Sequence, residues 1–242
     1  MSIGTFYGIG VGPGDPELIT VKGARLIAAC GCVVVPKSRM KKESIALKIA
    51  KQYISPGAEI VEQVYPMTSD KALLQEKWSQ AAGEVLNRLR KPQDVCFLTL
   101  GDPLFYSTHI YLLRCLKELD PELKTVTIPG IMAMGAASAI TDFPLGEAKK
   151  PVTVVPTSDD LVATRQAIKS GGNVVLMKVG ERLQPILDLL QELGVIDRAV
   201  FVAKAGQDAE VVVTDLMDLK ESDPKTGYLS IILIDADKEE CQ

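Results

Sequence analysis

The stretch Asp94-Val-Cys-Phe-Leu-Thr-Leu-Gly-Asp-Pro-Leu-Phe-Tyr-Ser-Thr108 decides how the first half of this chain folds. Its apolar run, Val95 to Leu100, is typical of a buried strand in a parallel sheet. Asp102 suits the N-cap of a helix and Pro103 its first position, where the missing N–H costs nothing. Gly101 lets a ligand approach the backbone at the strand's carboxyl end, which is where open α/β sheets bind ligands. The stretch therefore predicts a strand, a ligand-binding turn and a helix.

A second copy of the turn favours this interpretation over an ordinary connection. Gly14-Asp-Pro16 also follows an apolar strand, and Asp15 suits the cap of the helix after it. The alternating glycines before it suggest the GxGxxG fingerprint of dinucleotide-binding proteins, but Pro13 and Asp15 stand where its two possible registers require glycine. The acidic residue expected after the second strand is also missing, because that strand ends in Pro36-Lys37. These departures argue against a nicotinamide-dependent oxidoreductase.

The composition is that of a globular protein rich in aliphatic residues. The 242 residues are 47% hydrophobic, 24% charged and 5% aromatic, which suffices for one large or two modest domains. No apolar run reaches the ~20 residues that span a bilayer, and the N-terminus lacks a basic region followed by an apolar one, so we expect no membrane segment. The net charge of −4 predicts no general attraction to nucleic acid.

Cysteine and histidine usage indicates a reducing compartment and argues against a bound metal. The five cysteines have no CxxC spacing, and four lie in apolar segments where we expect small buried hydrophobes: Cys30, Cys32, Cys96 and Cys115. This pattern fits the cytoplasm. Because His109 is the single histidine, we expect no histidine-rich metal site.

A basic loop, Pro36-Lys-Ser-Arg-Met-Lys-Lys-Glu-Ser44, follows the second predicted strand, and Ser44 suits the cap of the next helix. Its cations fit a solvated loop. They also fit an anion-binding rim, because the loop lies at the carboxyl end of a strand. An acidic chain needs such a local cluster to attract an anionic ligand. The residues alone leave both interpretations open for Lys37, Arg39, Lys41 and Lys42.

Strand and helix patterns alternate through the rest of the chain. An Ala- and Gly-rich helix is expected over 131–140, and Pro144 to Pro151 is the best candidate linker. Beyond it, strands are predicted at 152–155, 173–177, 199–203, 210–213 and 228–234, with helices over 159–169 and 182–193. The expected architecture is two tandem α/β domains, 1–146 and 147–242, with a cleft between them.

Three motifs in this order resemble the tetrapyrrole (corrin/porphyrin) methylases: Phe6 to Lys22, Thr99 to Pro103 and Pro129 to Ile131. The resemblance runs nearly end to end. Val35 to Ser38, Tyr65 to Thr68 and Leu100 to Thr108 look like the branch that methylates C-20 of precorrin-2 or cobalt-factor II. The resemblance implies a two-domain methyltransferase that binds S-adenosylmethionine, forms S-adenosylhomocysteine and works as a homodimer.

The resemblance also implies particular site residues. Family cofactor contacts match Pro13, Leu100, Gly101, Asp102, Phe105, Met132, Ala133, Met177 and Ala205. The basic loop, with Lys37, Arg39, Lys41 and Lys42, is the candidate clamp for substrate carboxylates. Uroporphyrinogen-methylating relatives place an acidic residue where this chain has Pro36-Lys37, which argues against that branch. No catalytic base is identified for loss of the ring proton, and Tyr106 and water are the candidates.

Other functions stay open on the sequence alone. One is a sibling enzyme acting at another ring position, and related methylases act on ribosomal RNA or diphthamide. The pI of about 5.2 argues against the RNA version. A non-catalytic tetrapyrrole carrier would not need the cofactor positions at Met177 and Ala205. The sequence does not decide between metal-free precorrin-2 and its cobalt complex.

Overall fold

The structure is a computed structural model that describes residues 3–37, 44–65 and 70–237. It divides into two compact units, Met1–Met132 and Ala133–Gln242. Each unit is an α/β fold built on a five-stranded sheet, as the alternating patterns predict. Within these described ranges, no helix is long and apolar enough to cross a membrane.

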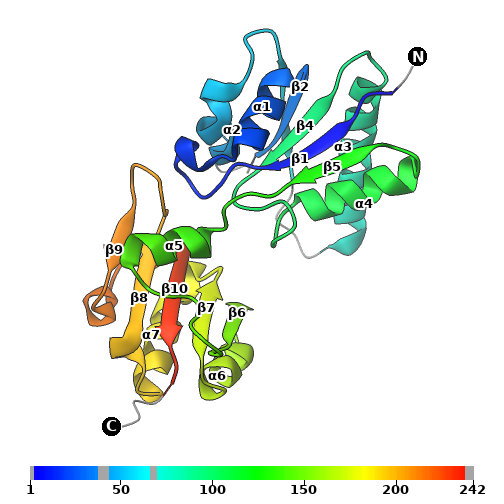
Figure 1. Ribbon diagram of the computed structural model, residues 1–242. Helices are drawn as coiled ribbons and strands as arrows, with labels where there is room; N and C mark the ends of the chain where they lie inside the picture. The colour runs from blue at the N-terminus through cyan, green and yellow to red at the C-terminus, as the bar shows by residue number, and fades with distance from the viewer. Residues whose placement is uncertain (1–2, 38–43, 66–69, 238–242) are drawn as a thin grey trace. The chain divides into compact units, whose positions relative to one another are not determined.

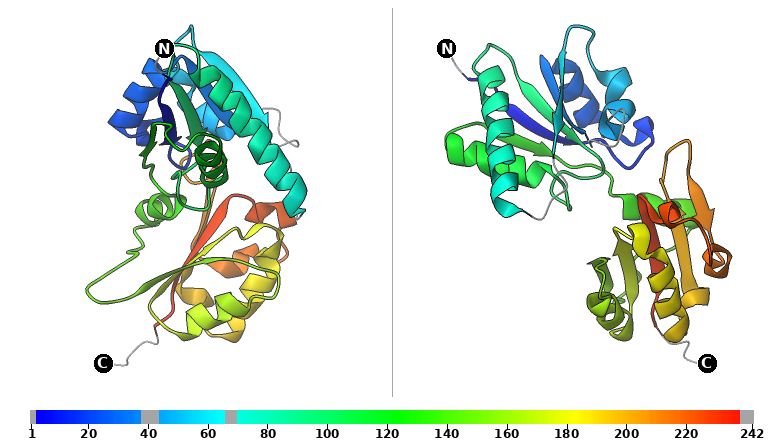
Figure 2. Two further views of the ribbon diagram at one scale, coloured as in Figure 1. Left: turned by 90° about the vertical axis from the view of Figure 1, so that its right-hand side faces the viewer. Right: turned by 180° about the vertical axis from the view of Figure 1, so that it is seen from behind.

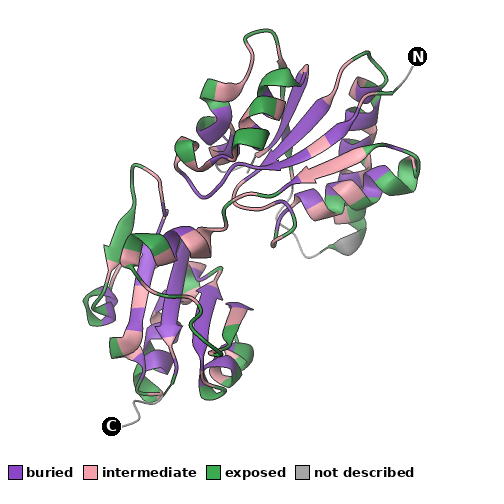
Figure 3. Ribbon diagram, viewed as in Figure 1, coloured by how far each residue is buried: buried purple, intermediate pink, exposed green. Residues whose placement is uncertain are grey.

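The first sheet is entirely parallel and has the order β3-β2-β4-β1-β5. Its strands are β1 (Phe6–Gly10), β2 (Cys32–Lys37), β3 (Glu59–Val64), β4 (Val95–Thr99) and β5 (Thr125–Ile128). The inner strands β1, β2 and β4 are buried, whereas the edge strands β3 and β5 are more exposed (Figure 3). Burial on both faces explains why the inner strands read as continuous apolar runs.

Helices cover both faces of the first sheet (Figures 1 and 2). On one face, α1 (Val21–Ala29) and α2 (Ile45–Ala50) pack against side chains such as Ile9, Val33 and Leu98. On the other, α3 (Lys71–Leu89) and α4 (His109–Leu119) pack against Phe6 and Phe97. Single-turn helices η1 (Pro16–Leu18) and η2 (Lys51–Tyr53) lie between these elements.

Two predicted helix starts are wrong. Asp15 accepts a hydrogen bond from the Glu17 amide and caps only the single turn η1. The backbone then turns extended at Ile19, and Thr20 caps α1 instead through the Gly23 amide at 3.0 Å. The helix expected directly after Asp102 begins only at His109, as α4.

Local predictions about buried side chains and other caps are confirmed. Ser44 caps α2, and the four cysteines of the apolar segments are buried free thiols. Trp78 of α3 is also buried, at 7% exposed, and stacks on Tyr65 with ring centroids 4.1 Å apart. These features depend on near neighbours in the chain, or on burial alone.

The second sheet has the order β6-β7-β10-β8-β9 and mixes pairings. Only β6 and β7 pair in parallel, and the final strand β10 runs antiparallel between β7 and β8. The strands are β6 (Val152–Pro156), β7 (Asn173–Met177), β8 (Ala199–Ala203), β9 (Val211–Val213) and β10 (Ser230–Asp235). Helix α5 (Ala133–Thr141) covers one face, and α6 (Val162–Lys169) and α7 (Leu183–Glu192) cover the other (Figure 1). Single-turn helices are η3 (Gly180–Arg182), η4 (Ile196–Arg198), η5 (Leu216–Leu219) and η6 (Pro224–Gly227).

The division into units lies before α5, ahead of the boundary at 146 that the sequence suggests. Helix α5 belongs to the second unit because its small side chains, Ala136 and Ala137, are buried against the second sheet. The segment taken as a linker is held by the same sheet: Asn173 Nδ2 donates to the carbonyls of Pro144 and Leu145 at 2.8 and 2.9 Å. Whether the parts 1–146 and 147–242 fold as independent domains stays a prediction.

Candidate functional site

Two glycine loops of the first unit are joined by their backbones. Gly101, after β4, donates its N–H to the Gly12 carbonyl at 2.8 Å, and the Gly12 N–H returns a bond to Gly101 at 3.3 Å. Both residues have positive φ, 77° at Gly12 and 68° at Gly101. This is the left-handed region that glycine adopts without steric cost. The predicted turn is therefore paired with the loop after β1.

A third loop, after β5, also packs its backbone against Gly101. A Cβ built on Gly130 would lie 2.1 Å from the Gly101 carbonyl oxygen, and one on Gly10 would lie 2.5 Å from the same atom. No real Cβ tolerates such contacts, so glycine is required at both positions for the three backbones to meet. At Gly101 itself the nearest atom to such a Cβ is the Ile131 carbonyl oxygen, at 4.0 Å. The turn therefore has open space beside it that a ligand can fill.

Asp102 fixes the arrangement of these loops. One carboxylate oxygen accepts a hydrogen bond from the Leu104 amide at 2.8 Å, and the other accepts one from the Gly130 amide at 3.0 Å. Both oxygens are thus used within the loops, which is why Asp102 is not the cap of α4. Hydrogen bonds to a charged acceptor are among the stronger ones in proteins.

The loop that begins at Asp102 is also anchored at its far end. The hydroxyls of Thr99 and Ser107 lie 2.8 Å apart and both side chains are buried. Ser107 Oγ also accepts the backbone N–H of His109 at 3.1 Å. The loop 102–108 therefore has fixed ends at the end of β4 and the start of α4.

His109 belongs to the core of the first unit. Its ring lies against Phe6 and Phe97, with centroids 5.8 and 5.9 Å away. Burial lowers its pKa to about 4, opposed in part by the negative charge of Asp102, so the ring is neutral at pH 7. Among the residues that the structure describes, no group of three or more His, Cys, Asp or Glu side chains could hold a metal ion.

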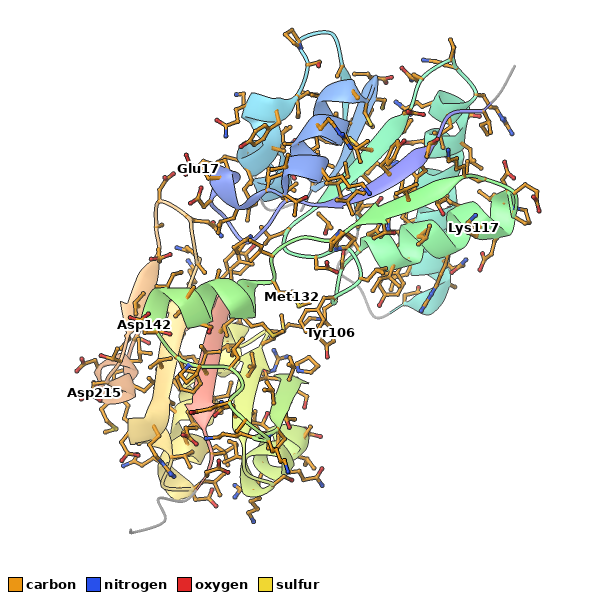
Figure 4. The ribbon with its side chains drawn as sticks, in the orientation of Figure 1. Glu17, Tyr106, Lys117, Met132, Asp142 and Asp215 are labelled. Carbon is orange, nitrogen blue, oxygen red and sulfur yellow. The ribbon has the colours of Figure 1, made fainter. Side chains whose placement is uncertain are left out.

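The structure gathers the predicted cofactor residues into one set in each unit. The first-unit set occupies the loops that follow β1, β4 and β5: Pro13, Leu100, Gly101, Asp102, Phe105 and Met132. In the second unit, Ala133 begins α5, Met177 ends β7 and Ala205 follows β8. These three residues belong to one apolar cluster on the α5 face of the second sheet. Figure 4 labels Met132 and Tyr106 at the carboxyl-end edge of the first sheet.

Of the four cations in the basic loop, Lys37 is the one that lies within the described residues. Lys37 ends β2, and its ammonium group pairs with Glu62 of β3 at 2.5 Å. The two strands are hydrogen-bonded neighbours, which brings these side chains together. Arg39, Lys41 and Lys42 lie outside the described residues.

The second unit holds a cavity that sequence reasoning missed. Its volume is about 530 Å³, and its lining residues come from the segments after β6 and β7: Asp159, Leu161, Glu181, Arg182 and Pro185. Two of the lining residues form an ion pair, with Arg182 Nε and Asp159 Oδ1 2.6 Å apart. Because β6 and β7 are parallel, their carboxyl ends meet at one edge. Open α/β sheets bind ligands at the carboxyl ends of their strands, so this edge is a second position suited to a ligand, as the edge at Gly101 is.

The fold and its loops define a class of protein: a two-unit α/β fold in which glycine-rich loops meet at the carboxyl ends of neighbouring strands. The sequence profile of the tetrapyrrole (corrin/porphyrin) methylases matches residues 5–220. The chain belongs to this family of methyltransferases.

Relatives of similar length carry more specific names. A probable cobalt-precorrin-2 C(20)-methyltransferase of Methanocaldococcus jannaschii is 32% identical over 94% of each chain. The cobalt-precorrin-2 C(20)-methyltransferase of Salmonella typhimurium is 29% identical over 96% of each chain. The precorrin-2 C(20)-methyltransferase of a Sinorhizobium species is 26% identical over 97% of this chain and 96% of the relative.

Solved structures show the same fold. A cobalt precorrin-4 methyltransferase superposes with a TM-score of 0.76 at 22% identity, covering 97% of this chain and 96% of that one. A uroporphyrin-III C-methyltransferase from Thermus thermophilus, complexed with S-adenosyl homocysteine, gives a TM-score of 0.66 at 21% identity. It covers 96% of this chain and 97% of that one.

Proposed function

We propose that this chain is an S-adenosylmethionine-dependent methyltransferase that methylates C-20 of precorrin-2 or cobalt-factor II in cobalamin biosynthesis. The observation that carries the proposal is the junction of Gly12, Gly101 and Gly130, held by Asp102. Two of these residues, Gly101 and Asp102, match the family's cofactor contacts. The names of the three full-length relatives support the choice of C-20.

The residues present fit this cofactor. Open space beside Gly101 at the carboxyl ends of parallel strands suits close approach of a ligand to the backbone. Ala133, Met177 and Ala205 share an apolar cluster, and such side chains can exclude water from a sulfonium. When bound, S-adenosylmethionine supplies an electrophilic methyl group for an electron-rich ring carbon. The binding loops must hold the reacting atoms ~3 Å apart and in line.

The tetrapyrrole substrate carries many carboxylates, and the basic loop is the proposed contact for them. Lys37 ends β2, and Arg39, Lys41 and Lys42 come after it in the sequence. The carboxyl end of β2 lies on the same edge of the sheet as those of β1 and β4. Cations at this edge would provide attraction that the overall charge of −4 does not. Tyr106 and water stay the candidate acceptors of the ring proton. We further propose a cytoplasmic homodimer.

The test is a pair of incubations of purified protein, with S-adenosylmethionine and with either precorrin-2 or cobalt-factor II. We expect a product heavier by one methyl group, and a ¹³C-methyl donor followed by NMR should place that group on C-20. Methylation at another carbon would show a sibling enzyme. Tetrapyrrole binding without calorimetric binding of S-adenosylhomocysteine would show a carrier and overturn the proposal.

A further inference from the structure

The loop 102–108 presents large apolar side chains to solvent between two fixed ends. Leu104 is 57% exposed and Tyr106 is 47% exposed. Asp102 anchors one end through Gly130, and Ser107 anchors the other through Thr99. Single exposed hydrophobic side chains are common on protein surfaces, so the exposure shows only that both side chains are accessible to a ligand.

The backbone at Tyr106 is also in an unfavourable conformation. Its φ is 53°, in the left-handed region that bulky side chains rarely adopt. Asn or Gly would occupy this position without that cost. Strained residues held in place by their surroundings cluster at binding and catalytic sites.

The Tyr106 ring has an aromatic contact within its own loop. Phe105 packs against it edge-on, with ring centroids 4.8 Å apart and planes at 69°. Edge-to-face packing is a favourable aromatic geometry, and it limits the orientations that the exposed ring can take. Phe105 itself is one of the residues that match family cofactor contacts. Tyr106 therefore stands immediately beside the proposed cofactor residues, at the carboxyl-end edge of the sheet (Figure 4).

We propose that the ring of Tyr106 is an aromatic platform that contacts a face of the tetrapyrrole macrocycle and positions it for methylation, with Leu104 adding apolar surface. This inference rests on the proposed function, because it takes the substrate to be a large, flat, conjugated ring. Such a ring offers two broad apolar faces, and stacking on an aromatic side chain is the contact suited to them. The contact uses the face of the side chain and does not need the hydroxyl.

The experiment compares Tyr106→Asn and Tyr106→Phe by titration with cobalt-factor II, followed by absorbance, without turnover. Asparagine suits the left-handed backbone, so we expect Tyr106→Asn to fold with a melting temperature at or above that of the wild type. It should weaken tetrapyrrole binding by about 10-fold or more. Tyr106→Phe should recover most of that loss. Affinity for S-adenosylhomocysteine, measured by calorimetry, should stay within a few-fold in both variants.

Tyr111→Asn is the matched control. Tyr111 is 51% exposed and lies in helix α4, where its ring stacks on Trp78 with centroids 5.3 Å apart. Its loss should leave tetrapyrrole affinity unchanged. The inference is overturned if Tyr106→Asn binds cobalt-factor II as the wild type does, or if Tyr106→Phe binds as weakly as Tyr106→Asn. It is also overturned if Tyr106→Asn changes the oligomeric state in light scattering, since the ring would then serve an interface between copies. Failure of wild-type protein to methylate C-20 would count against the proposed function, whereas the binding comparison judges the platform separately.

Discussion

The carboxylate of Asp102 and the backbone amide of Gly130 are joined by a hydrogen bond of 3.0 Å across two loops of the first sheet. The second oxygen of the same carboxylate holds the Leu104 amide at 2.8 Å. One side chain thus ties the loop after β4 to the loop after β5. Because residues of both loops match family cofactor contacts, the stability of this tie should control cofactor binding.

Replacing Asp102 by alanine should therefore weaken S-adenosylhomocysteine binding by roughly 10-fold or more, equivalent to about 1.4 kcal/mol. It should also lower the free energy of unfolding by about 1–3 kcal/mol, because the Gly130 amide loses its charged partner. Calorimetry and urea unfolding measure the two effects. Asp120→Ala is the control, since its carboxylate accepts from the Glu122 amide in an exposed turn. Equal cofactor affinity in wild type and Asp102→Ala would remove Asp102 from the site.

The glycine junction makes a graded prediction. Gly130→Ala should destabilise the fold most, because its Cβ would meet the Gly101 carbonyl oxygen at 2.1 Å and the backbone must move. Gly101→Ala should cost about 1–2 kcal/mol from its positive φ, since the space around that Cβ is open. Gly83→Ala, in α3 with no atom within 4 Å of the new methyl group, should instead stabilise by up to about 1 kcal/mol. Chemical unfolding tests the order, and a Gly130→Ala variant as stable as wild type would contradict the close approach.

The buried histidine predicts a pH dependence of stability. The pKa of His109 is about 4 in the folded state, below its ordinary value near 6.5, so the unfolded chain binds more protons between these pH values. Stability should therefore be complete above pH 6.5 and fall as the pH drops towards 4. Between pH 7 and pH 5 we expect a loss of about 2 kcal/mol from this group.

Because His109 is the only histidine, the test is direct. Urea unfolding at pH 7 and pH 5 should show a smaller difference in His109→Leu than in the wild type. The single imidazole Cε1 proton, followed by NMR, should not titrate between pH 5 and 7 while the protein is folded. A midpoint near 6.5 in that signal would refute the burial argument.

Local signals account for what could be read from the sequence. The run Val95–Leu100 identified a buried strand, and Gly101 identified the turn, because both depend on residues within a few positions. Asp102 was misassigned as a helix cap, since its partner Gly130 is distant in the chain and becomes a neighbour only through the order of the strands. Likewise, the Ala-rich pattern of α5 predicts a helix but does not say which sheet it covers.

The partner of a charged side chain also depends on which strands are neighbours, and Lys37 of the basic loop is an example. The sequence places Lys37 in a cluster of cations, but the parallel pairing of β2 and β3 brings its ammonium group to Glu62 at 2.5 Å. The Lys37 side chain is 26% exposed and the Glu62 side chain is 31% exposed. A partly exposed pair of this kind contributes little to stability, about 0–1 kcal/mol. If Lys37 binds a substrate carboxylate as proposed, Glu62 would compete with that carboxylate for the Lys37 ammonium group.

This competition predicts opposite effects for the two partners. Lys37→Gln should raise the KM for the tetrapyrrole, and with Arg39→Gln added the increase should reach about 10-fold or more. Glu62→Gln should lower the KM, because it leaves Lys37 available to the substrate. Added salt should raise the wild-type KM and affect the double variant less, since screening weakens the same contacts. Arg165→Gln, which removes an exposed pair with Glu192 in the second unit, is the control and should change neither KM nor its salt dependence. A KM that stays at the wild-type value in both Lys37→Gln and Glu62→Gln at low ionic strength would mean that Lys37 only solvates the end of β2, and the substrate carboxylates would need other partners.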